Sequence, residues 1–345
     1  MGNYIKLFET HSAYNTYITG GDAILPNVSY CEDQNGVHYN PIPSPSGLYL
    51  TFDILSDGTI TWSKYGSNSV IRTISYSTDN GANWTSITST SAGVVINVET
   101  GDKLIFKGEN NRYCDIADYD NYNHFGGTAS FNAYGNILSL FYGDNFAQYT
   151  QLPDITGYYG HMACLFSQSK VVSAKNLAIP SDTTNVDNYS YYSFFEGCTD
   201  LVEIPSLFIE NQYGVYSGCT SLTSMTIPNG VEVVGEGTFS GCTGLTSVTF
   251  PNTLTTIRGN AFSRCSGLTS ITIPDSVTTI DYYAFSDCTS LASVTVEATT
   301  PPTLSSSAFD NNASGRKIYV PADSENAYEA ASGWSTYAAD IEPIQ

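Results

Sequence analysis

The sequence predicts a mainly β protein of several domains: a small N-terminal leader, an Ig-like β-sandwich, and a solenoid of short repeats with a C-terminal cap. Two observations predict this arrangement. A repeat of 23 residues fills much of the second half of the chain, and short alternating segments separated by turn residues fill much of the first half. Leucine-type residues at fixed offsets in so short a repeat indicate a solenoid, in which each rung buries its apolar side against its neighbours.

The charge of the chain limits its partners. Among 345 residues, 12 Lys and Arg face 33 Asp and Glu, so the formal net charge is -21. Nucleic acid and anionic membranes would be repelled by such a surface, and we expect neither as a partner. The first residues lack the basic end and the apolar stretch of a secretory signal, and no run is long enough to span a membrane. We therefore expect no signal peptide in this chain.

Residues 1–47 predict a leader. It begins with an apolar strand at residues 4–8 and a short helix after Thr10 that has one apolar face. Two alternating segments around Asn35-Gly36 predict a hairpin, and the Pro-rich residues 41–47 predict a linker. The apolar helix face would dock on the next domain or on a partner chain, so we expect a homo-oligomer and a contact with a virion protein through this leader.

Residues 48–134 predict the Ig-like sandwich. About seven short strands alternate in polarity and are separated by turns such as Asn80-Gly81. We expect Trp62 and Trp84 to anchor the core of this sandwich. Residues 109–127 break the alternation and predict a long polar loop.

Residues 135–299 predict the solenoid. Segments such as SGCTSLTSMTIP and SGCTGLTSVTFP align their cysteines, and residues 165–180 fit the repeat with Ser169 at the same position. Rungs of a parallel ladder lie about 4.8 Å apart, so five thiols in one column cannot all pair evenly as disulfides. We expect reduced, buried thiols. The column consists of Cys198, Cys219, Cys242, Cys265 and Cys288.

Within a rung, alternation predicts that Leu268, Ile271 and Ile273 point inward and that Ser270 and Thr272 point outward. Residues 300–345 predict the cap, made of a partial rung, a strand and a short helix. We expect Trp334 to close the open end of the stack.

The pattern Ala/Thr-Phe-Ser-x-Cys-Thr-x-Leu-Thr-Ser-x-x-Ile-Pro resembles the BspA-like leucine-rich repeat, over roughly residues 160–345. This repeat occurs in surface proteins of gut and oral Bacteroidales and of parasitic protists. The resemblance implies adhesion to host matrix proteins or to other cells, and it brings no catalytic residues.

The front half is similar to multidomain proteins of gut Bacteroidales and their phages, on LPNVSYCEDQNGVHYNP and ISYSTDNGANWTSI. This second resemblance implies a virion component, such as a fibre or decoration protein. A phage protein needs no signal peptide and assembles in a reducing cytoplasm, which fits the unpaired cysteines.

Residues 77–84, STDNGANW, match the Asp-box of sialidases. Those enzymes carry several copies and a central arginine cluster, whereas here there is one copy, and Arg72 and Arg112 are the only arginines ahead of the solenoid. We interpret the motif as a rigid turn in which Asp79 caps backbone amides and Trp84 packs beneath.

Other chemistry has little support in the sequence. Asp115, Asp118 and Asp120 lie close enough to supply oxygens to Ca²⁺, but their spacing differs from the EF-hand, and a solvated loop is the alternative. The four histidines are scattered, and no cysteine spacing fits zinc. We therefore predict no enzyme, no metal and no cofactor; a glycan-active enzyme and an intracellular scaffold remain as alternatives.

The remaining candidate binding residues lie on the surface of the solenoid. Stacking predicts two outward rows of hydroxyls, and the Tyr282-Tyr283 pair in a loop offers rings for contact with sugar or protein. The rows consist of Ser224, Ser247, Ser270 and Ser293, and of Thr226, Thr249, Thr272 and Thr295. The sequence thus predicts a non-catalytic recognition protein on a virion or another exterior surface, which binds a protein or glycan of a cell surface. A bacterial surface adhesin is the alternative to the virion component.

Overall fold

A computed structural model of the chain describes residues 31–32, 38–39, 49–66, 71–110, 113, 122–148, 162–179, 190–205 and 212–345. The predicted leader helix, the Pro-rich linker and the aspartate loop at 115–120 lie outside these residues. Within the leader, β1 (Cys31–Glu32) pairs antiparallel with β2 (His38–Tyr39), the two arms of the predicted hairpin. None of the helices in the described ranges has the length and apolar character needed to cross a membrane.

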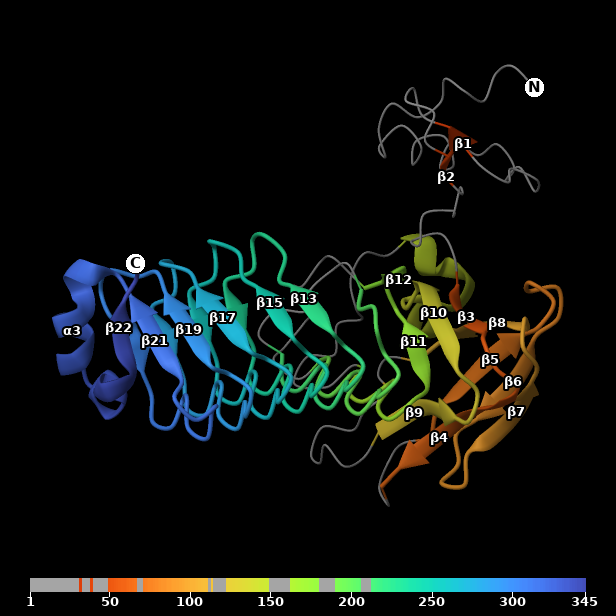
Figure 1. Cartoon of the computed structure of the whole chain (residues 1–345). Coiled ribbons are helices and arrows are strands. Elements are labelled where there is room, and N and C mark those ends of the chain that lie inside the picture. The colour runs from red at the N-terminus through yellow and green to blue at the C-terminus, as the bar shows by residue number, and fades with distance from the viewer. Residues whose placement is uncertain are drawn as a thin grey trace.

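The front half of the chain forms two β-sheets (Figure 1). Phe125 in the smaller sheet contacts Phe52 and Phe106 in the larger one, with 4.9 Å between ring centroids in both pairs, so the apolar faces of the sheets pack together. The larger sheet contains β10 (Phe131–Asn136), β3 (Leu50–Ile54), β8 (Lys103–Gly108), β5 (Thr73–Ser77) and β6 (Thr85–Thr88), in this order, and the smaller contains β7 (Val94–Val98), β4 (Gly58–Tyr65) and β9 (Tyr122–Gly127).

Three expectations for this region need correction. Strand β9 lies within the segment predicted as a loop and pairs with β4 along its whole length, with Asn123 and Phe125 buried. Trp62 is buried as predicted, but Trp84 is only partly buried and packs against Tyr49, 5.2 Å between ring centroids, instead of in the core. The first strand, β3, lies between β10 and β8, whereas the first strand of an Ig-like domain lies at a sheet edge.

Strand β10 belongs to both halves of the molecule. It pairs antiparallel with β3 and parallel with β11 (Val171–Ser173) and β12 (Leu177–Ala178), the first strands after the junction. Between β10 and β11, α2 (Ser139–Tyr142) and the 3-10 helix η2 (Gly143–Gln148) occupy positions where the sequence predicted the start of the solenoid.

The solenoid carries two strips of parallel strands. The first strip has β13 (Ser224–Thr226), β15 (Ser247–Thr249), β17 (Ser270–Ile273), β19 (Ser293–Val296), β21 (Lys317–Val320) and β22 (Ile341–Pro343). The second has β14 (Val233–Val234), β16 (Thr256–Ile257), β18 (Thr279–Ile280) and β20 (Thr303–Leu304). The predicted alternation is confirmed, because Leu268, Ile271 and Ile273 are buried while Ser270 and Thr272 are exposed.

A stack of aromatic rings runs through the core of the solenoid. Its neighbouring ring centroids lie 5.3 to 5.7 Å apart. The stack comprises Phe166, Phe195, Tyr216, Phe239, Phe262, Phe285 and Phe309. Phe166 also contacts Phe52 and Phe125 of the front sheets, so both halves share one hydrophobic core.

The predicted cysteine column is buried and its thiols are free. Each thiol donates to the carbonyl oxygen of an aromatic residue in the preceding rung, as in Cys242 to Tyr216 at 3.1 Å. Ser169 occupies the first position of this column, with its hydroxyl 3.5 Å from the sulfur of Cys198. A small side chain that donates a weak hydrogen bond fits this column, because the adjacent rung leaves little space for a larger side chain.

The cap closes the stack as predicted. Trp334 is buried, its ring lies 6.0 Å from that of Phe309, and its Nε1 donates to the carbonyl oxygen of Pro302 at 2.8 Å. The cap is built from β21, η3 (Ala322–Ser324), α3 (Glu325–Ala330), η4 (Trp334–Asp340) and β22. The buried side chains of Tyr328 in α3 and of Trp334 and Tyr337 in η4 cover the apolar end of the last rung.

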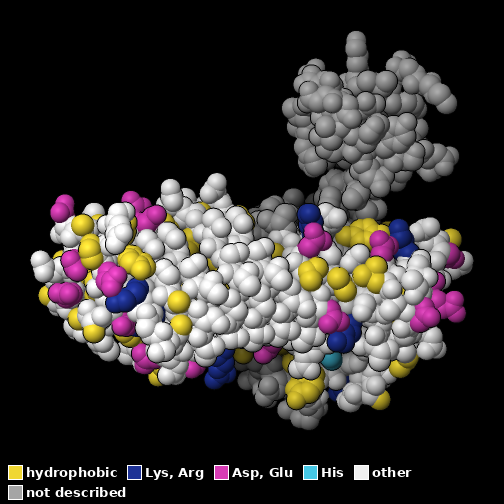
Figure 2. Space-filling view, in the orientation of Figure 1, with side chains coloured by type: hydrophobic (Ala, Val, Ile, Leu, Met, Phe, Trp, Pro, Cys, Tyr) yellow, Lys and Arg dark blue, Asp and Glu magenta, His cyan; other side chains and the backbone are white. Residues whose placement is uncertain are grey.

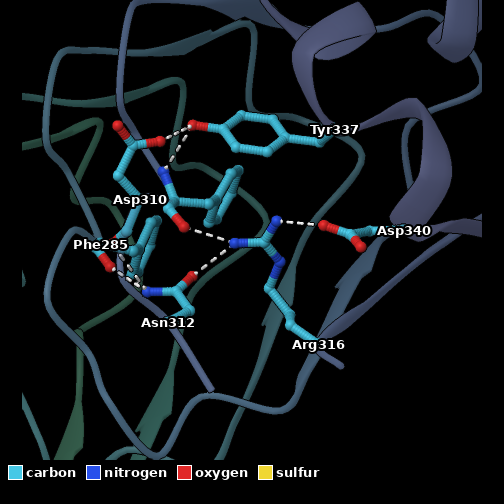
Figure 3. A network of polar contacts seen from close by, with 7 residues as sticks. Phe285, Asp310, Asn312, Arg316, Tyr337 and Asp340 are labelled. Carbon is cyan, nitrogen blue, oxygen red and sulfur yellow. Dashed lines mark hydrogen bonds and ion pairs between the residues drawn. The ribbon is translucent and has the colours of Figure 1, made fainter. Parts of the chain in front are cut away.

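A buried arginine ties the cap to the last rungs (Figure 3). The Arg316 guanidinium donates to the carbonyl oxygen of Phe309, to Asn312 Oδ1 at 3.0 Å and to Asp340 Oδ2 at 2.5 Å. It also lies 4.9 Å from the centroid of the Tyr337 ring. These contacts join η4 to the residues that lead into β21.

Candidate functional site

The predicted hydroxyl rows lie side by side on the first strip of strands. Strand β13 pairs in register with β15, and β17 with β19, so that each Ser and each Thr meets its counterpart in the neighbouring strand. The alternate residues, such as Met225 and Val294, are buried beneath them. We call the outward side chains the hydroxyl face: Ser224, Thr226, Ser247, Thr249, Ser270, Thr272, Ser293 and Thr295.

The hydroxyls of this face have no intramolecular partner among the residues that the structure describes. Neighbouring hydroxyls behave differently. Thr246 donates to the carbonyl oxygen of Thr223 at 2.9 Å, Thr255 to that of Glu232 at 3.0 Å, and Ser276 to that of Leu254 at 2.7 Å. Those side chains link successive rungs, whereas the hydroxyl face keeps its donors and acceptors for water or for a ligand.

The hydroxyl face is uncharged. Strands β13, β15, β17 and β19 contain no ionisable residue, in a chain with a net charge of -21. Figure 2 shows this side of the rungs as a broad neutral area, with charged side chains mainly toward the two ends of the molecule. A neutral partner can approach such a surface without long-range repulsion.

At the capped end the two rows no longer consist of Ser and Thr. Lys317 follows Ser293 in the register, and Tyr319 follows Thr295. Lys317 pairs with Glu342 at 2.6 Å, and this hydrogen bond raises the pKa of the lysine. The sequence prediction missed this border, although the spacing of KIYV after the last rung would have located it.

Tyr282 and Tyr283 lie on the turn that follows β18, away from the strands of the hydroxyl face. Their side chains are 40% and 46% exposed, and their rings meet edge to face with 6.1 Å between centroids. The Tyr282 hydroxyl donates to Glu236 Oε1 at 2.7 Å. This hydrogen bond to a carboxylate raises the pKa of Tyr282 to about 12, so the phenol stays protonated.

The Asp-box segment is a turn, as predicted. Asp79 Oδ1 accepts from the Ser77 hydroxyl at 2.6 Å and from the Asn83 backbone N–H at 2.8 Å. These hydrogen bonds lower the pKa of Asp79 to about 2. Trp84 packs against the turn near Gly81. Of the two arginines ahead of the solenoid, Arg112 lies outside the described residues.

Across the described ranges, no three His, Cys, Asp or Glu side chains are grouped closely enough to hold a metal ion. The aspartates at 115, 118 and 120 lie outside those ranges, so the calcium alternative stays an untested prediction.

Comparison with known proteins identifies the repeats. Residues 207–332 match the BspA type leucine rich repeat region in six copies. The chain is similar to a leucine rich cell surface protein from Faecalibacterium prausnitzii, with 22% identity, a TM-score of 0.32, and coverage of 48% of this chain and 51% of that one. It thus spans about half the length of that relative.

A second solved structure, a leucine-rich repeat protein from Bacteroides ovatus, has 17% identity and a TM-score of 0.22 and covers 53% of this chain and 70% of that one. No curated protein matches the chain. The repeat pattern, the two strips of parallel strands and the family match agree with one another. Residues 207–332 are thus similar in sequence to the BspA-type leucine-rich repeat.

Proposed function

We propose that the protein is a non-catalytic recognition protein that binds an uncharged partner through the hydroxyl face. One observation carries this proposal: eight outward hydroxyls without internal partners form a regular, uncharged surface on a strongly acidic chain. Binding there desolvates hydroxyls instead of charges, and each hydroxyl regains a hydrogen bond from the partner, so the cost of desolvation is small.

The BspA-type repeats support adhesion as the biological role. The resemblance of these repeats to those of surface proteins supports display on an exterior surface, with a protein or a neutral glycan of another cell as the partner. A long, regular face of parallel strands offers many equivalent contacts instead of one deep pocket, which suits adhesion.

We further propose a virion component, a fibre or a decoration protein, with a bacterial cell-surface adhesin as the alternative. The buried, unpaired thiols support assembly in a reducing compartment. Mass spectrometry separates the two: the virion proposal requires the chain in purified phage particles, and the adhesin proposal requires it in washed bacterial envelopes.

The hydroxyl face is tested with charged variants of the full chain. Thr249→Glu and Thr272→Glu place a carboxylate in the middle of the face, while Thr289→Glu places one on an exposed turn outside it. All three sites are exposed, so each variant should keep the stability of the parent to within about 0.5 kcal/mol. The probes are immobilised extracellular-matrix proteins, whole gut bacteria and a panel of neutral glycans.

We expect binding to the best probe to fall by about tenfold or more for the two face variants, equivalent to ~1.4 kcal/mol, and to stay unchanged for Thr289→Glu. Equal binding by all four proteins would show that the hydroxyl face is only a solvated sheet surface.

A further inference from the structure

The turn after the second strip of strands carries a surface feature that the hydroxyl face does not include. In successive rungs one position of this turn holds Tyr213, Glu236, Gly259 and Tyr282. Backbone hydrogen bonds join these rungs. Gly237 N donates to Gly259 O at 2.9 Å, and Asn260 N donates to Tyr282 O at 3.0 Å. The four side-chain positions therefore form a row along the solenoid.

Gly259 is in this row to make room for the ring of Tyr282. A Cβ atom at Gly259 would lie 2.5 Å from Tyr282 Cζ and 2.6 Å from Cε2. The backbone at Gly259 is outside the left-handed region, and the equivalent positions carry Glu and Tyr, so the turn itself does not require a glycine. The Tyr282 ring lies against the rung at Gly259 and reaches Glu236, two rungs away in the row.

The groups around the Tyr282 ring carry charges of both signs. The Glu236 carboxylate meets its hydroxyl end, and near its backbone end Asp281 pairs with Arg258 at 3.8 Å. Tyr283 stands edge-on beside it, with a φ of 55°. The equivalent positions of the two preceding rungs are Gly237 and Asn260, which adopt positive φ at lower cost than a tyrosine does. The same conformation recurs at Ser307 in the next rung, so it belongs to the repeat turn, and the Tyr283 ring is presented at the surface by that turn.

We propose that Tyr282 and Tyr283 form a carbohydrate-binding platform for neutral sugars. The exposed side of the Tyr282 ring offers a flat, electron-rich surface, on which the C–H face of a pyranose can stack. Glu236 and Asp281 accept hydrogen bonds from sugar hydroxyls, and Arg258 donates them. An anionic partner fits less well, because the two carboxylates beside the platform, Glu236 and Asp281, outnumber its one cation, Arg258.

The platform is tested on the full chain by isothermal titration calorimetry. The probes are short neutral oligosaccharides of β-linked glucose, xylose, mannose and galactose. For the best-binding probe, Tyr282→Ala removes the platform and Gly259→Ala displaces the ring without removing it, and we expect both to weaken binding by about tenfold or more. Tyr282→Phe keeps the ring and should lose less. Tyr65→Ala, which removes another exposed tyrosine in the front sheets, should bind as the parent does.

Melting temperatures separate lost binding from lost folding, and Tyr282→Phe keeps the test valid if Gly259→Ala proves unstable. The inference is overturned if none of the oligosaccharides binds, if Tyr282→Ala binds as the parent does, or if poly-lysine binds in place of sugar. Thr249→Glu should leave sugar binding at the platform unchanged, so the proposals for this site and for the hydroxyl face can be tested independently of each other.

Discussion

The thiol of Cys265 donates a hydrogen bond to the carbonyl oxygen of Phe239 in the preceding rung, with 3.1 Å between sulfur and oxygen. The same bond recurs along the column, and it fixes each sulfur in the dry core beside the aromatic stack. Burial raises the pKa of Cys198 and of Cys242 to about 12. The thiolate, which is the reactive form, is therefore scarce at neutral pH.

The first prediction concerns the reactivity of these thiols. In the folded protein at about pH 8, we expect no alkylation of Cys198, Cys219, Cys242, Cys265 or Cys288 by iodoacetamide, because all five thiols are buried and out of reach of the reagent. Peptide mass spectrometry measures the modification at each site. The same reaction in guanidinium chloride is the control and should modify all five; rapid labelling in the folded state would contradict a closed core.

The second prediction compares two neighbours on one strand. Ile271 points into the core and Ser270 points to solvent. Ile271→Asp buries a carboxylate without a partner and should cost more than about 4 kcal/mol, enough to unfold the neighbouring rungs. Ser270→Asp should change stability by no more than about 0.5 kcal/mol. Urea denaturation followed by circular dichroism measures both, and similar losses in the two variants would contradict the assigned inward and outward positions.

The third prediction concerns the cap. Arg316→Ala removes hydrogen bonds to Phe309 O, Asn312 and Asp340, and we expect a loss of about 2–3 kcal/mol in the free energy of unfolding. Arg316→Lys keeps the charge but not the planar fork, so it should recover only part of this loss. Limited proteolysis should cut the cap of Arg316→Ala first. The control is Lys317→Ala, whose side chain is much more exposed; a loss equal to that of Arg316→Ala would refute the special role of the guanidinium.

The fourth prediction concerns acid. The folded-state pKa of Asp79, about 2, lies below its ordinary value of 3.8, because Ser77 and Asn83 donate hydrogen bonds to the carboxylate. Asp79 therefore stabilises the fold above about pH 4, and this contribution is lost as the pH falls through about 2. Asp79→Asn should melt at a lower temperature than the parent at about pH 6, and the difference should shrink between about pH 4 and pH 2. A difference that is constant over this range would exclude ionised Asp79 as its cause.

The repeat region was the most predictable part of the molecule. Alignment of the cysteines fixed the register, and once the register is known, alternation decides which side chains of a strand such as β17 are buried. The turn at Asp79 and the closure by Trp334 were also predictable, because each depends on local chemistry or on the need to cover an apolar end.

The front half was less predictable for physical reasons. The sequence of β9, YNHFGG, lacks β-branched residues and is stabilised by its pairing with β4, a contact distant in sequence that no local pattern reports. Trp84 sits at the edge of a turn, where only part of its ring can be covered. The platform at Tyr282 was within reach of the sequence, since a glycine at 259 stands in a row whose other members have side chains.

The double pairing of β10 has a mechanical consequence. Because β10 is hydrogen-bonded both to β3 and to β11, continuous strand pairing couples the two halves among the described residues of their junction. A pull on the capped end is transmitted through the stacked rungs directly into the front sheets, and the two halves turn together. The described part of the chain from residue 49 onward thus moves as one piece, and the hydroxyl face keeps a fixed angle to the front sheets.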